Sequence, residues 1–76
     1  MGYMINIPTG IVDNDTMHEY CMEIHYIDGY VEIYNSYTAP EEAEEYMIYL
    51  MNETSEIRCI DVWEDLVWWG EAIRTK

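Results

Sequence analysis

Residues 19–37 read EYCMEIHYIDGYVEIYNSY, and this stretch decides the fold of the 76-residue chain. Every second residue from Tyr20 to Tyr26 is large and mostly apolar, which is the period of a half-buried strand. Asp28-Gly29 follows, and this pair supplies the positive φ angles that a two-residue type I′ turn requires. The stretch therefore predicts a β-hairpin.

A two-residue turn also determines which side chains of the hairpin face the core. It pairs Ile27 with Tyr30 and places Ile24 opposite Ile33 on one apolar face. The opposite face is then exposed to solvent and receives the acidic and aromatic side chains. These are Glu19, Glu23, Tyr30, Glu32 and Tyr34.

Residues 38–46, TAPEEAEEY, predict the start of a helix that covers about 39–52. Thr38 and Glu41 match a capping box, in which the threonine oxygen accepts from the amide of residue 41 and the glutamate reaches back to the backbone. Pro40 fits the first turn, where a missing N–H costs little. One helix is therefore expected directly after the hairpin.

At 100° per residue this helix has a core side and a solvent side. The core side consists of Ala43, Tyr46, Met47 and Leu50. The solvent side carries Glu41, Glu45, Ile48 and Asn52, with Glu44 and Tyr49 flanking them. No Lys or Arg lies within a helical turn or two of the glutamates, so their charge is uncompensated.

The C-terminal segment, residues 56–73, reads EIRCIDVWEDLVWWGEAI and fits a second hairpin. A turn at Glu64-Asp65 would pair Arg58 with Glu71, an opposite-charge pair across the two strands. The high content of Val and Trp favours strands.

The alternative for residues 62–74 is a helix. Its apolar stripe would consist of Val62, Leu66, Trp69 and Ile73. Gly70 lies in the middle of this segment and is a poor helix former, so the hairpin is the preferred interpretation.

These segments together predict a single α+β domain over residues 1–76. Its elements follow one another as ββαββ, with an antiparallel sheet and one helix packed on one face. The apolar run Tyr3–Ile7 predicts an additional short strand at the N-terminal edge. A chain of this length buries only about 60% of its unfolded surface, so it has little room for an enclosed active site.

A calcium site is not expected in the N-terminal loop. Asp13-Asn14-Asp15 resembles the start of an EF-hand loop, but His18 and Ile24 replace the glycine and the final glutamate that such a loop needs. A turn exposed to solvent is the simpler interpretation.

The histidines and cysteines do not predict a zinc or catalytic site either. His18, Cys21, His25 and Cys59 are zinc-ligand types, but they lack paired C-x-x-C spacing, and His18 points to the other face of its strand. The hairpin register places His25 opposite Glu32 as a charge pair rather than a general base, since no nucleophile or cleft accompanies it. We therefore expect no enzyme activity, no metal and no cofactor.

The charge of the chain is its most unusual property. Sixteen Asp and Glu stand against three Lys and Arg, giving a net charge of −13, and the first 57 residues contain no Lys or Arg. This field repels nucleic acid and anionic membranes and favours a basic partner. We expect that partner to be a protein that itself binds nucleic acid.

The expected location is the cytoplasm. Two cysteines are too few for a disulfide framework, and the chain does not open with a secretory signal peptide. No 18-residue apolar run is present, so a membrane span is not expected.

In length, charge and the order of hairpin, TAPEEAEEY helix and second hairpin, the chain resembles small acidic inhibitors carried by phages. These include anti-CRISPR proteins and related DNA mimics. The resemblance implies a basic nucleic-acid-binding partner in the host cytoplasm, such as a CRISPR effector, which is blocked sterically without a cofactor.

We expect the partner to bind a surface in which carboxylates surround aromatic and aliphatic anchors. Its residues are Glu19, Glu23, Tyr30, Glu32, Tyr34, Glu41, Glu42, Glu44, Glu45, Ile48 and Tyr49. The alternative is a non-enzymatic interaction module, such as a homodimer or an adaptor, that associates through Trp63, Trp68 and Trp69.

Overall fold

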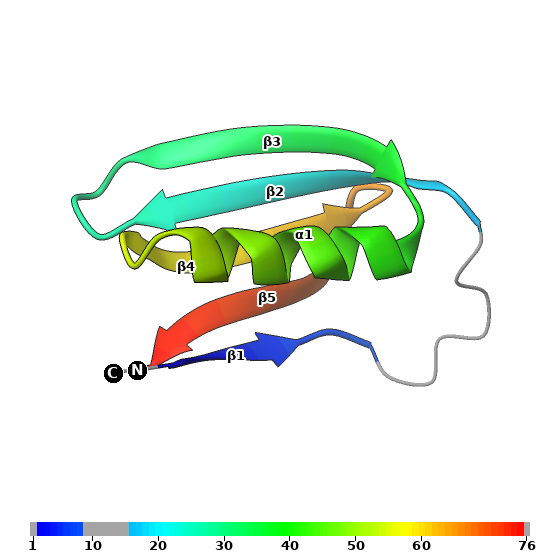
Figure 1. The fold of residues 1–76 in the computed structure, drawn as a ribbon. Coiled ribbons are helices and arrows are strands. Elements are labelled where there is room, and N and C mark those ends of the chain that lie inside the picture. Colours follow the sequence, from blue (N-terminus) through cyan, green and yellow to red (C-terminus); the bar gives the residue numbers. More distant parts are fainter. Residues whose placement is uncertain (1, 9–15, 76) are drawn as a thin grey trace.

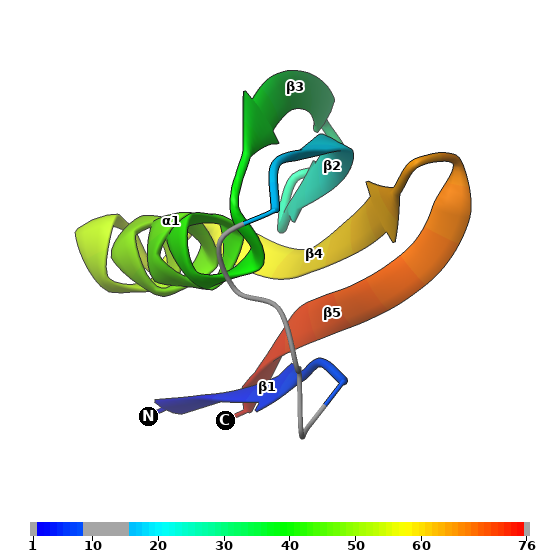
Figure 2. The ribbon, with the colours of Figure 1, turned by 90° about the vertical axis from the view of Figure 1, so that its right-hand side faces the viewer.

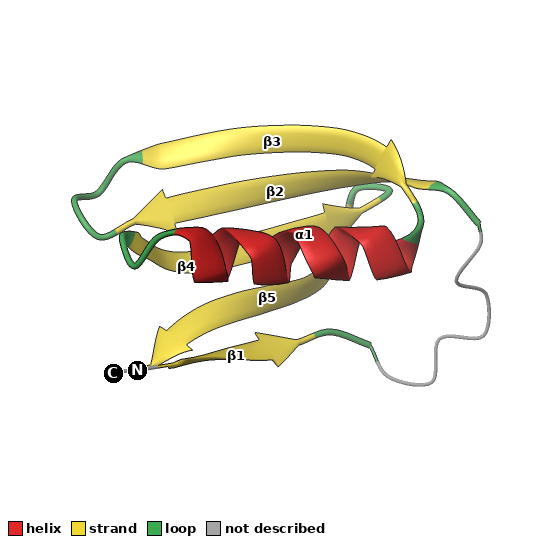
Figure 3. Cartoon of the chain, viewed as in Figure 1, coloured by secondary structure: helices red, strands yellow, loops and turns green. Residues whose placement is uncertain are grey.

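The computed structural model describes residues 2–8 and 16–75, and in this part of the chain five strands form one antiparallel sheet with a helix on one face (Figures 1 and 3). The elements are β1 (Gly2–Asn6), β2 (His18–Tyr26), β3 (Val31–Thr38), α1 (Pro40–Glu53), β4 (Ile57–Glu64) and β5 (Val67–Thr75). The order across the sheet is β1-β5-β4-β2-β3. The α+β prediction is confirmed. The additional N-terminal strand is also present, as β1 at the sheet edge beside β5, so the number and order of the strands differ from ββαββ.

The β2–β3 hairpin forms, but its turn is one residue longer than predicted. The Tyr26 N–H donates to the Tyr30 carbonyl over 2.9 Å, and the Gly29 N–H donates to the Tyr26 carbonyl over 3.0 Å. The loop therefore contains three residues, Ile27, Asp28 and Gly29. Gly29 has a φ of 94°, the left-handed conformation typical of the last residue in such loops.

The extra turn residue moves the side chains of β3 to the opposite faces of the sheet. Ile24 lies opposite Glu32, and Glu23 lies opposite Ile33. The predicted apolar pairing of Ile24 with Ile33 is therefore wrong. The β3 side chains on the face away from α1 are Val31, Ile33, Asn35 and Tyr37.

The second hairpin also forms, and the helical alternative for residues 62–74 is wrong. Its turn is at Asp65-Leu66 rather than Glu64-Asp65. Both turn residues have positive φ, 49° and 73°, as in a type I′ turn.

The pairs of this second hairpin shift with its turn. Trp63 lies opposite Trp68. A register irregularity between Val62 and Trp63 then shifts the pairing of the two strands by one more residue. As a result Glu71 lies opposite Asp61, and the predicted pair of Glu71 with Arg58 does not form.

Helix α1 begins as predicted, but its cap is shifted by one residue. Ala39 is the N-cap, and Glu42 rather than Glu41 occupies the third helical position. One carboxylate oxygen of Glu42 accepts from the Thr38 hydroxyl at 2.6 Å and lies 3.5 Å from the Ala39 amide nitrogen. This arrangement retains the return contact of a capping box without a side-chain oxygen at the N-cap.

The core lies between α1 and the face of the sheet that α1 covers (Figure 2). The core-facing prediction is confirmed for Ala43 and Met47, which are buried, whereas Tyr46 and Leu50 pack at the edge of the core. Met51 is also buried but was not predicted. The hydrophobic core consists of Tyr20, Met22, Ile24, Ala43, Met47, Met51, Ile57, Ile60, Val62, Trp69 and Ala72.

The N-terminal strand approaches β5 closely at Gly70. A Cβ atom at this position would lie 2.5 Å from the Asn6 carbonyl oxygen and 2.8 Å from Cγ2 of Ile7. Only glycine permits this approach without displacing backbone. Tyr3 and Ile5 of β1 can then pack against the core.

Candidate functional site

The predicted hairpin surface is divided between the two faces of the sheet. Glu19 and Glu23 lie on the face away from α1, because their neighbours Tyr20 and Met22 are buried beneath the helix. Glu32 and Tyr34 lie on the α1 side, opposite Ile24 and Met22. We call these the uncovered and the covered face.

On the covered face, five tyrosines from β2, the β2–β3 turn, β3 and α1 form two groups of neighbouring rings, Tyr26 with Tyr30 and Tyr46 with Tyr34 and Tyr49. The tyrosine cluster consists of Tyr26, Tyr30, Tyr34, Tyr46 and Tyr49. Ring centroids are 5.6 Å apart for Tyr26 and Tyr30, 4.7 Å for Tyr34 and Tyr46, and 6.1 Å for Tyr46 and Tyr49. The cluster thus joins predicted residues of the hairpin to predicted residues of the helix.

Glu32 connects the tyrosine cluster to its acidic surroundings. The Tyr26 hydroxyl donates to a Glu32 carboxylate oxygen over 2.8 Å, and this bond raises the pKa of Tyr26 to about 12. Burial, with smaller effects from Tyr34 and Glu32, raises the pKa of Tyr46. Both tyrosines are therefore neutral hydroxyl donors at physiological pH.

The predicted helix residues differ in how far they are exposed. Glu41, Glu42 and Glu45 are exposed, whereas Glu44 and Ile48 are half-buried. Tyr49 is 54% exposed and stacks on Tyr46. Hydrogen bonds from the Thr38 hydroxyl and the Ala39 amide lower the pKa of Glu42, so this carboxylate has a structural role in addition to its charge.

The carboxylates of the described residues have no Lys or Arg partner. In residues 2–8 and 16–75, the ion pairs join His18 to Asp65 and His25 to Glu23 and Asp61. Arg74 donates instead to the carbonyls of Met51, Thr54 and Ile57. The acidic surface is therefore available to an external cation or a basic protein.

The uncovered face contains a histidine between two carboxylates. His25 Nε2 lies 3.3 Å from Glu23 Oε1 and 3.5 Å from Asp61 Oδ2. His25 lies opposite Val31 on β3 and opposite Cys59 on β4. The predicted pairing of His25 with Glu32 is wrong, because the longer turn places Glu32 on the other face.

The Cys59 thiol next to this histidine is not activated for nucleophilic attack. Burial, reinforced by the negative charge of Asp61, raises the pKa of Cys59. Burial also raises the pKa of Asp61, and Glu71 and Glu23 add to the rise against the effect of His25. A protonated thiol is a poor nucleophile, so this geometry does not favour covalent catalysis.

Asp65 lies in the β4–β5 turn and connects this turn to the N-terminal end of β2. Its carboxylate accepts from the Glu19 amide over 3.1 Å and lies 2.7 Å from His18 Nδ1. The contact with His18 and the bond from Glu19 lower the pKa of Asp65. Next to it, the Tyr20 hydroxyl donates to Glu64 over 2.6 Å, and burial and this bond raise the pKa of Tyr20.

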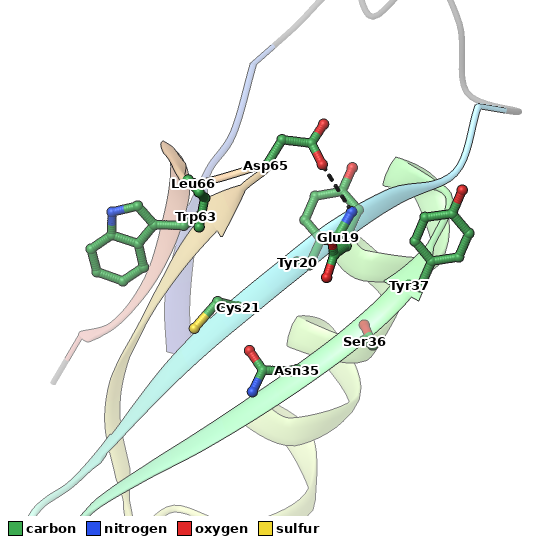
Figure 4. A pocket seen from close by; sticks show the side chains of 9 residues that line it. All are labelled: Glu19, Tyr20, Cys21, Asn35, Ser36, Tyr37, Trp63, Asp65 and Leu66. Carbon is green, nitrogen blue, oxygen red and sulfur yellow. Dashed lines mark hydrogen bonds between the residues drawn. The ribbon is translucent and has the colours of Figure 1, made fainter.

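A pocket of about 350 Å³ lies near this link (Figure 4). Figure 4 shows the side chain of Asp65 reaching toward Glu19 at its edge. The residues that line it come from β2, β3, β4 and the β4–β5 turn. They are Glu19, Tyr20, Cys21, Asn35, Ser36, Tyr37, Trp63, Asp65 and Leu66.

The end of the β4–β5 hairpin is apolar and exposed. Leu66, Val67 and Trp68, which we call the hairpin tip, include the most exposed large apolar side chain of the described residues, Leu66 at 94%. Trp68 is 52% exposed, whereas Trp69 is buried in the core. The three tryptophans therefore do not form one surface, because Trp69 is buried in the core.

Sequence reasoning named Trp68 of the hairpin tip as a contact residue of the alternative module, but it missed the exposed Leu66 and Val67 and the group around His25. The predicted hairpin gave β2 a partner only in β3. Cys59 and Asp61 reach His25 because β4 pairs with the other edge of β2. The shared apolar–polar alternation of β2 and β4 was the available signal, but it does not specify the register between strands so far apart in sequence.

Comparison of the chain with protein-family models, curated proteins and solved structures finds no match. In the part of the chain that the structure describes, no helix has the length and apolar character needed to cross a membrane. The functional argument therefore rests on the chain's own residues.

Proposed function

We propose that this protein binds a basic nucleic-acid-binding protein and blocks its nucleic-acid channel. The binding surface, called here the acidic tyrosine surface, consists of the tyrosine cluster with Glu32, Glu41, Glu42 and Glu45. The observation that supports this proposal is that exposed carboxylates without Lys or Arg partners lie on the same hairpin and helix as the tyrosine cluster, in which the ring of Tyr46 contacts those of Tyr34 and Tyr49.

Each component of the surface has a physical role in such binding. The carboxylates accept charge-assisted hydrogen bonds from Lys and Arg and accelerate association with a basic surface. Tyr34 and Tyr49 provide large rigid side chains of the kind that dominates binding energy at interfaces. Glu19 and Glu23 are not part of this surface, because they lie on the uncovered face.

The mode of action is steric competition with nucleic acid. A net charge of −13 gives the protein the same sign as a nucleic acid, so it can occupy a channel lined with Lys and Arg. No cofactor and no catalytic step is required. A CRISPR effector is the target class that the resemblance of the chain to small acidic phage inhibitors favours.

Two double variants with the same change in charge test which face binds. Glu41→Lys/Glu45→Lys alters the acidic tyrosine surface, and Glu19→Lys/Glu56→Lys is the control on other exposed positions. Protein captured from a host lysate at low salt and released at high salt is identified first. We then measure whether our protein and the nucleic acid compete for binding to this captured protein.

We expect the first double variant to lower the association rate constant by about tenfold at low salt, and the control to have a smaller effect. The salt dependence of association should also become weaker in the first variant. An equal loss in the control would show that net charge alone drives association. If our protein does not change the nucleic-acid binding of the captured protein, the proposed blockade is wrong.

The hairpin tip favours a second candidate function, an interaction or dimerisation module. Leu66, Val67 and Trp68 are consecutive residues at the end of this hairpin, and all three expose apolar side chains, a feature of protein-binding sites. Sedimentation equilibrium over a hundredfold concentration range tests the dimer form. A mass that rises with concentration in the natural protein but not in Leu66→Ser/Trp68→Ser would support it, and a monomer mass throughout would exclude it.

A further inference from the structure

Two adjacent cross-strand pairs on the uncovered face bring together four side chains that bind metals. His25 lies opposite Cys59, and Glu23 lies opposite Asp61. Residues two apart on a strand point to the same face, so all four side chains are neighbours. Both strands have hydrogen-bonded neighbours on either side, which gives the group a rigid base.

The spacing of the donor atoms is close to that of a zinc site. Single donor atoms of His25, Cys59 and Asp61 all lie within 4.8 Å of one another, and Glu23 lies outside this group of three, next to His25. His25 Nε2 is 3.3 Å from Glu23 Oε1 and 3.5 Å from Asp61 Oδ2. Bond lengths of about 2.0–2.3 Å place the donors around tetrahedral zinc about 3.3–3.8 Å apart. Rotations of the Cys59 and Glu23 side chains toward His25 and Asp61 would complete this arrangement.

We propose that His25, Cys59, Asp61 and Glu23 bind one Zn²⁺ ion. An imidazole, a thiolate and two carboxylates are a complete donor set for four-coordinate zinc. The thiolate and the imidazole select Zn²⁺ over Mg²⁺ and Ca²⁺, which prefer oxygen ligands. The ion would also offset the negative charge of two carboxylates that otherwise share a single imidazole.

The second group of potential ligands, His18, Glu64 and Asp65, serves as a built-in comparison. Its carboxylates already accept from the Tyr20 hydroxyl and the Glu19 amide, and it lacks a thiol. The proposed zinc site is separate from the acidic tyrosine surface, because it lies on the uncovered face. The two proposals can therefore succeed or fail independently.

Cobalt binding provides a direct test, because a thiolate bound to Co²⁺ produces a charge-transfer absorption that carboxylates do not. The metal-free, reduced full-length protein is titrated with Co²⁺ and then with Zn²⁺. We expect one Co²⁺ per chain, the thiolate absorption, and complete displacement by one equivalent of Zn²⁺. Absence of binding at micromolar protein, or displacement of Co²⁺ by an equal concentration of Mg²⁺, would overturn the proposal.

Matched variants assign the ligands. Cys59→Ser should lose the charge-transfer absorption, whereas Cys21→Ser, at the other half-buried cysteine of the same face, should retain it. His25→Gln should weaken Zn²⁺ affinity at least about tenfold, and His18→Gln should leave it unchanged. Circular dichroism in the presence of EDTA verifies that each variant folds, and Asp61→Asn provides a second ligand variant of unchanged size. Equal effects of Cys21→Ser and Cys59→Ser would contradict the site.

Discussion

The guanidinium group of Arg74 connects β5 to the C-terminal end of α1. Its Nη2 donates to the Met51 and Thr54 carbonyls over 3.0 and 2.8 Å, and its Nε donates to the Ile57 carbonyl over 2.8 Å. The last turn of α1 has no basic residue of its own. Arg74 therefore supplies both the hydrogen bonds and the positive charge that a helix C-terminus requires.

We predict that Arg74→Met lowers the free energy of unfolding by about 2–3 kcal/mol, because it leaves partly buried carbonyls without donors. Urea denaturation measures this change. Arg58→Met is the control, since Arg58 is exposed and its loss changes the net charge by the same amount. A difference of less than about 0.5 kcal/mol between the two variants would show that water replaces the guanidinium without cost.

At the level of elements, the sequence specified the strands and the helix better than the turns. Alternation from Tyr20 to Tyr26 identified β2 and its buried face, because burial of every second side chain leaves a periodic signal. The turns were misplaced because Asp28-Gly29 is compatible with loops of two and of three residues. At the second hairpin, Leu66 adopts a positive φ that its residue type does not suggest.

These small errors had large consequences for the candidate site. One extra residue in the first loop moved Glu32 and Tyr34 to the covered face, where they join residues of α1. The group around His25 depends on the pairing of β2 with β4, strands separated by β3 and α1 in the sequence. Such long-range register is set by packing of the whole sheet, so local patterns do not contain it.

The β4–β5 turn gives a prediction about an element under strain. Leu66 has a φ of 73°, which costs a residue with a Cβ about 1–2 kcal/mol. Leu66→Gly removes that strain but increases the freedom of the unfolded chain, so the expected net gain is about 0.5–1 kcal/mol. Leu66→Ala, which keeps the Cβ and loses only exposed side-chain atoms, should change stability little. Urea denaturation that gives equal gains for both variants would show that strain is not the cause.

If this strained turn is retained because the hairpin tip binds a partner, stability and binding should change in opposite directions. Strained backbone that persists in a protein is a reason to look for function at that position. Leu66→Gly would then be more stable than the natural protein and weaker in partner binding. This links the turn to the second candidate function rather than to the acidic tyrosine surface.

For the molecule as a whole, the net charge of −13 must oppose folding, and its effect depends on salt. The radius of gyration is 12.0 Å, smaller than the Debye length of about 30 Å at 10 mM salt. At low salt, repulsion between carboxylates therefore extends over most of the molecule. At 500 mM the Debye length is about 4 Å, shorter than the spacing of about 6 Å between Glu41 and Glu45 on the helix.

We therefore predict that raising NaCl from 10 to 500 mM increases the free energy of unfolding by about 1–2 kcal/mol, as measured by urea denaturation in EDTA. The matched control replaces Glu41, Glu45, Glu53 and Glu56 with Gln, which changes the net charge from −13 to −9. This variant should be more stable at 10 mM and gain less from salt, because fewer repulsions remain to be screened. An equal gain in both proteins would mean that salt acts through a general effect on burial. The uncompensated charge would then have no measurable cost to the fold, and the argument that binding of a basic partner accounts for it would lose this support.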